Sequence, residues 1–366
     1  MKSVYPLESI SIEQAKEFQF RMVDEITKEF GGAEFLSIGD LGLVSGYNKP
    51  ATTLKAEKVI ASFFGVQKAL FIRGAGTGAI ANALFSIKSL TSPNLLIHKA
   101  PIYNTTKTSL QMMEIKTVEA NFNKLDEIND VMGKNPQISA ALIQYTRQNI
   151  DDSYDMGEVI NVIKQNRDIP IITDDNYAVM KVKKIGVELG ADLSCFSTFK
   201  LLGPQGIGCI VGKQKYVDYI AARLYSGGSQ TQGFEAMDAL RGLVYAPLAL
   251  AVQAQVVEEL AGRLNSGEIG EVSSAFIANA QSKVLIVEFK EDIAKEVLQK
   301  AQLLGAAPHP VGAESKYEIA PMFYRVSGTF LASDPSIAKR MIRINPMRAG
   351  ANTVVRILKE ALKQGK

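Results

Sequence analysis

The chain has 366 residues, of which 41 are basic and 38 acidic, and 46% are hydrophobic. The charges are mixed along the chain, so no segment is typical of a nucleic-acid-binding arm. The first residues lack the apolar core of a signal peptide, and no apolar run suggests a membrane span. We therefore predict a soluble cytoplasmic protein with one large and one smaller domain.

Cysteine and histidine are too scarce for a structural zinc site, since the chain has two of each. Cys195 and Cys209 both lie in apolar, strand-like runs. Core packing in a reducing compartment is the favoured interpretation, and a reactive thiol is the alternative. We predict no bound metal.

The first two thirds of the chain alternate between short apolar strands and amphipathic helices. An N-terminal helix over 8–30 precedes a glycine-bearing stretch and a second helix over 53–64. Expected strands follow at 68–72, 95–98, 115–118, 139–143, 169–173, 192–196 and 208–211, with helices that include 77–90 and 156–165. This alternation predicts an α/β fold, a three-layer α/β/α large domain with a mostly parallel sheet.

The pattern changes after residue 212. Residues 233–265 are helical and interrupted at Pro247, and they predict a long connector. Strands at 284–289, 317–326 and 341–344, with helices at 293–304 and the C-terminus, predict a smaller α+β domain. The expected domains are an N-terminal helix and arm (1–50), a large domain (51–245) and a connector with a small domain (246–366).

A glycine turn, Gly74-Ala75-Gly76-Thr77-Gly78-Ala79, lies between a predicted strand and a predicted helix. Backbone N–H groups at a helix N-terminus favour an anion, and a monophosphate bound by Gly76, Thr77 and Gly78 fits this turn. The turn also matches a dinucleotide fingerprint, but the next strand ends without the acidic residue that binds the ribose. A tight turn without a ligand is the remaining alternative.

An acidic turn, with Asp174 and Asp175 followed by Asn176 and Tyr177, comes at the carboxyl end of a predicted strand. Open α/β sheets bind ligands at this edge. A carboxylate there can pair with the ring nitrogen of pyridoxal phosphate (PLP). A magnesium site would need further acids, with Asp151-Asp152 the nearest in sequence, and a solvated capping turn is the third alternative.

Lys200 follows a buried strand in Ser197-Thr198-Phe199-Lys200 and precedes a Gly/Pro loop. A lysine at this position can form an imine with a carbonyl compound. The order of the three turns, phosphate, acid and lysine, resembles that of the fold-type I PLP-dependent enzymes, the aspartate aminotransferase superfamily. The similarity covers about residues 45–350.

Within that superfamily the chain is similar to the class V aminotransferases and the cystathionine/methionine-metabolism enzymes. The shared segments are Asp175-Asn176-Tyr177-Ala178, the Ser-x-x-Lys at 197–200 and Leu240-Arg241-Gly242-Leu243. More closely, the chain resembles the uncharacterised bacterial YhfS-like proteins, in the segments ITDDNYAVMKV and AESKYEI. That closer resemblance implies no established reaction.

The resemblance implies roles for individual residues. Lys200 would form the internal aldimine and carry the proton of the substrate α-carbon. Ser197 would bind phosphate together with the glycine turn, and Asp175 would pair with the pyridine nitrogen, Asp174 being the alternative. Tyr103 would stack on the ring, and Arg343 would bind a substrate carboxylate.

Two segments depart from the resembled families. Tyr47-Asn48-Lys49-Pro50 stands where related lyases have a Tyr-x-Arg that reaches the partner subunit's phosphate. Residues 144–148 lack the asparagine that contacts the phenolic oxygen, and Thr146, Arg147 and Gln148 are expected in the wall of the site. The loop 225–232 either approaches a partner subunit or links the domains flexibly.

These observations predict a homodimeric PLP enzyme that acts on a small amino acid, with sites shared across the interface. Aminotransferase chemistry is the nominal reaction, and a Cβ/Cγ–X lyase is the alternative. A PLP-binding protein without turnover is a further alternative. A nicotinamide dehydrogenase is the least favoured, because the ribose-binding acid is missing.

Overall fold

The computed structural model describes most of the chain and divides it into two compact units. The described residues are 4–91, 94–100, 102–146, 149–278, 284–312, 314–326 and 328–363. The large unit comprises residues 13–145 and 154–247, and the C-terminal unit comprises 1–12, 146–153 and 248–366. The N-terminal segment therefore divides between the two units at residue 12.

Most elements of the large unit lie within two residues of the predicted positions. Its helices are α1 (Ile12–Glu29), α2 (Ala51–Phe63), α3 (Ala75–Thr91), α4 (Asn104–Met112), α5 (Leu125–Lys134), α6 (Met156–Asn166) and α7 (Gln214–Ala221). Short 3-10 turns are η1 (Glu34–Leu36), η2 (Gly186–Leu189) and η3 (Thr198–Leu201). Its strands are β1 (Lys68–Arg73), β2 (Asn94–His98), β3 (Lys116–Ala120), β4 (Ile138–Gln144), β5 (Ile171–Asp174), β6 (Leu193–Ser197) and β7 (Ile207–Gly212).

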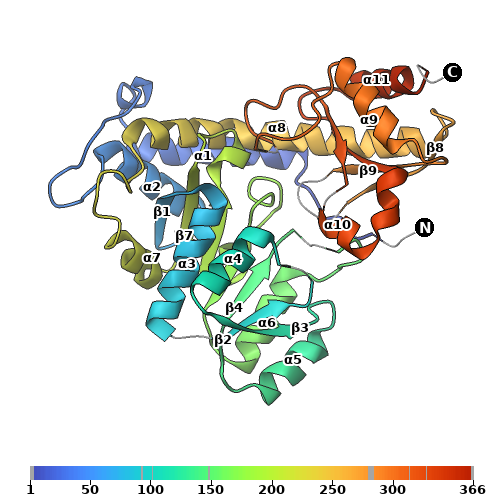
Figure 1. Ribbon diagram of the computed structural model, residues 1–366. Helices are drawn as coiled ribbons and strands as arrows, with labels where there is room; N and C mark the ends of the chain where they lie inside the picture. The colour runs from blue at the N-terminus through green and yellow to red at the C-terminus, as the bar shows by residue number, and fades with distance from the viewer. Residues whose placement is uncertain are drawn as a thin grey trace. The chain divides into compact units, whose positions relative to one another are not determined.

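The strands form one seven-stranded sheet in the order β1-β7-β6-β5-β4-β2-β3 (Figure 1). Strand β7 is antiparallel to both of its neighbours, and the pairs from β6 to β3 are parallel. The mostly parallel sheet that the sequence predicts is therefore confirmed. Parallel strands need helical crossovers, which place helices on the faces of the sheet.

Alternate residues of each strand enter separate cores on the two faces, because side chains alternate along a strand. Leu95 and Ile97 of β2 pack in the core that includes α3 and α7. Leu96, between them, packs in the core that includes α5 and α6, which lie side by side near β3 (Figure 1). Both faces are thus covered, which confirms the three-layer α/β/α arrangement.

Helix α8 (Gly233–Asn265) is continuous, so the expected interruption at Pro247 is wrong. The helix interior tolerates this proline, and the boundary between the two units falls directly after it. By length and composition alone α8 would be able to cross a membrane, with a mean hydropathy of 1.4 over its most apolar 18 residues. However, 56% of that window is buried within the protein, as is also common in core helices.

A glycine of α8 allows the helix to approach the turn that carries Lys200. A Cβ on Gly242 would lie 2.6 Å from the nitrogen of Gly203 and 2.7 Å from the oxygen of Leu201. Beside it, Arg241 donates hydrogen bonds to the backbone oxygens of Phe35 and Ser37. The segment 240–243 therefore packs against the lysine turn through Gly242 and bonds to the N-terminal arm through Arg241.

The C-terminal unit contains an antiparallel sheet in the order β10-β11-β9-β8. Its strands are β8 (Val272–Ile277), β9 (Leu285–Phe289), β10 (Met322–Arg325) and β11 (Met341–Asn345). Its helical segments are α9 (Ala294–Leu303), α10 (Gly328–Ser333), η4 (Pro335–Lys339) and α11 (Ala351–Lys363). Strand β8, whose burial pattern is irregular, is absent from the predicted strands, and β10 is shorter than the strand predicted at 317–326.

Candidate active site

Three loops begin at the same edge of the seven-stranded sheet. Strands β5 and β6 run in parallel, with Asp174 opposite Cys195. Ser197 of β6 and Ile72 of β1 both pair with Gly208 of β7, from its opposite sides. The acidic turn, the lysine turn and the glycine turn therefore leave the sheet at one level, as expected of a ligand-binding edge.

The glycine turn leads directly into α3, which begins at Ala75. Gly74 has a φ of 97°, which favours glycine. A Cβ on Gly78 would lie 2.1 Å from the oxygen of Arg73, and a Cβ on Gly76 would lie 2.5 Å from the side chain of Asn176. The first N–H groups of a helix lack intrahelical acceptors, so this turn can receive a phosphate.

Asp175 is fully buried, and one of its two oxygens is satisfied within the protein. Its Oδ2 accepts hydrogen bonds from the Thr173 hydroxyl (2.9 Å) and the Gly186 N–H (3.2 Å). Its Oδ1 is buried and has no hydrogen-bond partner among the described residues. Burial raises the pKa of this carboxyl to about 7, against the opposing effect of its hydrogen bonds. A buried oxygen without a partner is costly, and a ligand donor would satisfy it.

Asp174 is also buried, but it faces a different set of groups. Its Oδ1 accepts from the backbone N–H (3.1 Å) and side-chain Nδ2 (2.7 Å) of Asn176. Burial raises the pKa of Asp174, while these bonds and the charge of Lys200 act in the opposite direction. The carboxylate with the unsatisfied oxygen is thus Asp175, the residue predicted to face the pyridine nitrogen.

The lysine turn places hydroxyls and the amine around Asn176. Ser197 is buried, its N–H donates to Asn176 Oδ1 (3.1 Å), and its hydroxyl makes no hydrogen bond in the described part of the chain. By contrast, the Thr198 hydroxyl is bonded to the oxygen of Ile207 (2.7 Å). Half-buried Lys200 directs its Nζ toward Asn176 Oδ1 at 3.4 Å. Ser197, rather than Thr198, can therefore offer a hydroxyl to a phosphate.

Tyr177 and Lys181 are neighbours of Lys200 to which the sequence analysis gave no role. The Lys200 Nζ lies 4.4 Å from the centroid of the Tyr177 ring, and the Nζ of buried Lys181 lies 5.5 Å from it. Tyr177 has a φ of 66° and Met180 a φ of 61°, conformations that are uncommon outside glycine. Because such conformations cluster at functional sites, the whole turn is part of the candidate site. The shared segment Asp175-Asn176-Tyr177-Ala178 includes Tyr177, but the sequence assigned no role to Tyr177 or Lys181.

Tyr103 lies at the N-terminus of α4 and is 49% exposed. Two residues further on, the Thr105 hydroxyl accepts a hydrogen bond from the Thr77 hydroxyl (3.2 Å). This contact brings the start of α4 to the glycine turn. The placement agrees with a ring-stacking role for Tyr103, which stays a prediction, and it adds Thr105 to the candidate site.

Arg343 belongs to the C-terminal unit, in the buried strand β11. Its Nε donates to the oxygen of Arg325 (2.8 Å), and its guanidinium lies 4.1 Å from the centroid of the Tyr324 ring. These contacts hold the guanidinium in a defined orientation, and its role toward a substrate carboxylate stays a prediction. Of the predicted wall residues, Thr146 is buried in the same unit, and Arg147 and Gln148 lie outside the described residues.

The loop 225–232 is anchored at its C-terminal end. The oxygen of Gln230 accepts from Arg73 Nε (3.2 Å), and that of Thr231 accepts from the Thr53 hydroxyl (2.8 Å). The side chain of Gln232 accepts from the N–H of Gly42 (2.9 Å). The loop therefore connects β1, α2 and the N-terminal arm, and these contacts disagree with a flexible interdomain link.

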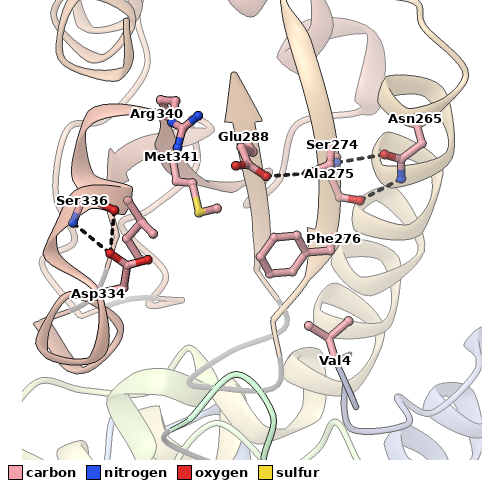
Figure 2. Close-up of a pocket in the computed structure, with 11 residues that line it drawn as sticks. Val4, Asn265, Ser274, Ala275, Phe276, Glu288, Asp334, Ser336, Arg340 and Met341 are labelled. Atoms are coloured by element: carbon pink, nitrogen blue, oxygen red, sulfur yellow. Dashed lines mark hydrogen bonds between the residues drawn. The ribbon is translucent and has the colours of Figure 1, made fainter. Parts of the chain in front are cut away.

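A cavity of about 460 Å³ in the C-terminal unit contains none of the predicted site residues (Figure 2). Its polar groups largely bond to one another. Figure 2 shows Ser274 with Glu288, Asn265 with the backbone of Ala275, and Asp334 with Ser336. Elsewhere too, the described residues contain no group of three or more His, Cys, Asp or Glu side chains suited to a metal.

Comparisons with known proteins identify the family. Residues 48–239 match the model of the class-V aminotransferase family, and residues 258–358 match that of the YhfS-like C-terminal domain. The chain therefore belongs to the class-V aminotransferase family, within the fold-type I PLP-dependent enzymes. This membership confirms both the family and the cofactor that the sequence predicts.

Particular relatives are similar over different lengths. The uncharacterized protein YhfS of Escherichia coli strain K12 is 50% identical over 98% of each chain. The crystal structure of the pyridoxal-5'-phosphate-dependent protein YhfS from Escherichia coli has a TM-score of 0.96 and 49% identity, and covers 99% of each chain. Cystathionine gamma lyase CalE6 from Micromonospora echinospora has a TM-score of 0.70 and 16% identity, over 87% of this chain and 88% of its own. At that identity the likeness extends to the fold alone.

The residues at the sheet edge fit PLP. Its pyridine nitrogen would meet the unpartnered Oδ1 of Asp175, and its phosphate would meet the Ser197 hydroxyl and the N-terminus of α3. Lys200 presents its amine at the same edge, because its Nζ contacts the side chain of Asn176 in the acidic turn.

Proposed function

We propose that the protein is a PLP-dependent enzyme that acts on a small amino acid, nominally an aminotransferase. The observation that carries this proposal is the buried, unpartnered Oδ1 of Asp175 at the edge that also presents Lys200. When bound, PLP supplies a ring that accepts the electrons of a substrate bond at the α-carbon.

The residues of the chain would each perform one task. Asp175 would hold a proton on the pyridine nitrogen, which its buried, unpartnered Oδ1 favours. Lys200 would hold the cofactor and then take and return the proton of the substrate α-carbon. Ser197, with Gly76, Thr77 and Gly78, would bind the phosphate, and Tyr103 would cover the ring. Arg343 would bind the substrate carboxylate through its planar guanidinium.

A Cβ/Cγ–X lyase is the second candidate. The lyase fold of CalE6 supports the same architecture, although its low identity carries no reaction to this chain. The two reactions differ in stoichiometry, because transamination needs an amino acceptor and elimination does not. A panel of amino acids, tested for keto-acid formation with and without an added keto-acid acceptor, separates them. Keto acid that forms only with an acceptor supports the transferase, and acceptor-independent release of ammonia contradicts it.

We also propose that the protein is a homodimer. The arm between α1 and α2 exposes large apolar side chains: Leu36 is 86%, Ile38 79% and Leu41 74% exposed. The arm is nevertheless held in place, because Asp40 accepts the N–H groups of Ala51 (2.8 Å) and Thr52 (3.1 Å). An ordered, exposed apolar surface of this kind favours a protein partner, and the preferred partner is a second copy. Light scattering should give twice the chain mass, and the variant Ile38→Asp with Leu41→Asp should give a monomer.

We also propose a cytoplasmic location for the protein. Both cysteines are buried free thiols, which a reducing compartment preserves. Fractionation of cells that express the tagged protein tests this location, and recovery in the membrane fraction would contradict it.

A further inference from the structure

Asn176 contacts all three turns of the candidate site. Its Oδ1 accepts from the Ser197 N–H (3.1 Å) and lies 3.4 Å from the Lys200 Nζ. Its Nδ2 donates to Asp174 Oδ1 (2.7 Å). Gly76 has no side chain where Asn176 passes, since a Cβ there would lie 2.5 Å from the amide. No other described side chain joins the acidic, lysine and glycine turns in this way.

The orientation of the amide is determined by its partners. An asparagine side chain has a donor end and an acceptor end, which are exchanged when it rotates by a half turn. The Asp174 carboxylate accepts only, so it selects the Nδ2 end. The Ser197 N–H donates only, so it selects the Oδ1 end. The carbonyl oxygen is therefore directed toward Lys200.

We propose that Asn176 is a positioning residue for Lys200, and that Asp174 sets the orientation of its amide. This inference rests on the proposed PLP-dependent function. The oxygen of the Asn176 side chain directs the amine as a hydrogen-bond acceptor. An amine attacks a carbonyl carbon at a useful rate only when it is directed toward it, and the contact of 3.4 Å with Asn176 Oδ1 supplies this direction. The arrangement also separates the two acids, because Asp174 orients the amide while Asp175 would pair with the pyridine nitrogen.

The test measures how fast Lys200 becomes covalently attached to PLP. Cofactor-free, full-length protein is mixed with PLP, treated with borohydride at intervals, and digested to quantify the modified Lys200 peptide. Asn176→Leu should attach PLP about tenfold more slowly, the loss expected for one hydrogen bond to an ionisable donor. As a control, Asn265→Leu removes an exposed amide of the C-terminal unit that is bonded to the backbone of Ala275, and it should leave the attachment rate unchanged.

An exchange of the two side chains separates positioning from folding. Asn176→Asp alone places two carboxylates at the 2.7 Å contact with Asp174, and should slow attachment at least as much as Asn176→Leu. Asp174→Asn combined with Asn176→Asp restores one donor and one acceptor at the same net charge. This double exchange should recover the rate to within about threefold of wild type. Thermal unfolding of each variant shows whether any change in rate merely follows stability.

Two results would overturn the inference: a wild-type attachment rate in Asn176→Leu, or a double exchange no faster than Asn176→Asp. If Asn176→Leu does not fold, the exchange pair decides. The proposed function fails separately, since it requires that wild-type protein acquires the label on Lys200 at all.

Discussion

Asp175 of the large unit and Glu318 of the C-terminal unit are both buried acids, but their surroundings differ. Glu318 accepts from the N–H groups of Val311, Gly312 and Ser315, and from the Ser315 hydroxyl. These bonds lower the pKa of Glu318, although burial opposes them. Asp175 has an oxygen without a partner and a pKa raised to about 7.

The difference separates a structural acid from a functional one. Both oxygens of Glu318 accept hydrogen bonds from backbone N–H groups of the chain. Asp175 is held in place through one oxygen, while the protein leaves the other unsatisfied at a cost in stability. Perturbed groups of this kind cluster at functional sites. The two acids should therefore respond in opposite ways to the same isosteric change.

The largest expected effect is on activity. Asp175→Asn keeps the shape of the side chain but removes the charge that, in the proposed function, would hold a proton on the pyridine nitrogen. We expect turnover of the best amino acid substrate to fall by about a hundredfold, since a buried charge-assisted hydrogen bond contributes about 3 kcal/mol. Steady-state kinetics on PLP-saturated protein measures this fall. Turnover within threefold of wild type would contradict the assigned role.

The matched change in the other unit should act on stability instead. Glu318→Gln replaces a carboxylate by an amide whose NH₂ group faces N–H donors. The free energy of unfolding should fall by about 2 kcal/mol, and urea titration followed by circular dichroism measures it. Attachment of PLP to Lys200 should continue at the wild-type rate. If attachment fails while the protein stays folded, the distinction between the two acids is lost.

The pH dependence of stability should sharpen the comparison further. The folded state raises the pKa of Asp175 to about 7, so it retains a proton that the unfolded chain has already released. Its neutral form therefore contributes stability at low pH, and this contribution is lost as the pH rises to about 7. Between pH 5 and 8, cofactor-free wild type should lose up to about 3 kcal/mol relative to Asp175→Asn. Parallel pH profiles of the two proteins would contradict the raised pKa.

Much of this edge follows from local sequence signals. Apolar runs place β5 and β6, and the polar residues that end them must share one edge because the strands are parallel. The glycine turn is recognisable because Gly76 and Gly78 leave room for close contacts. These signals require only the neighbouring residues, so they were visible without the fold.

Other features depend on contacts between distant segments. Asp175 keeps its Oδ1 without a partner because Thr173 and Gly186 both donate to its Oδ2. The contact of Thr77 with Thr105 forms only because α4 packs beside the glycine turn. Strand β8 has an irregular burial pattern with a register shift, so the period-two signal of a strand is weak. Pro247 remains within α8, although local propensity predicts a break there.

The most direct test of the central claim is to identify the residue that holds the cofactor. Wild-type protein with PLP should be yellow, and borohydride reduction followed by peptide mass spectrometry should locate one pyridoxyl group on Lys200. Lys200→Ala should stay colourless and unlabelled while it remains folded. A label on Lys181, which lies against the same Tyr177 ring, or no label in wild type, would contradict the account.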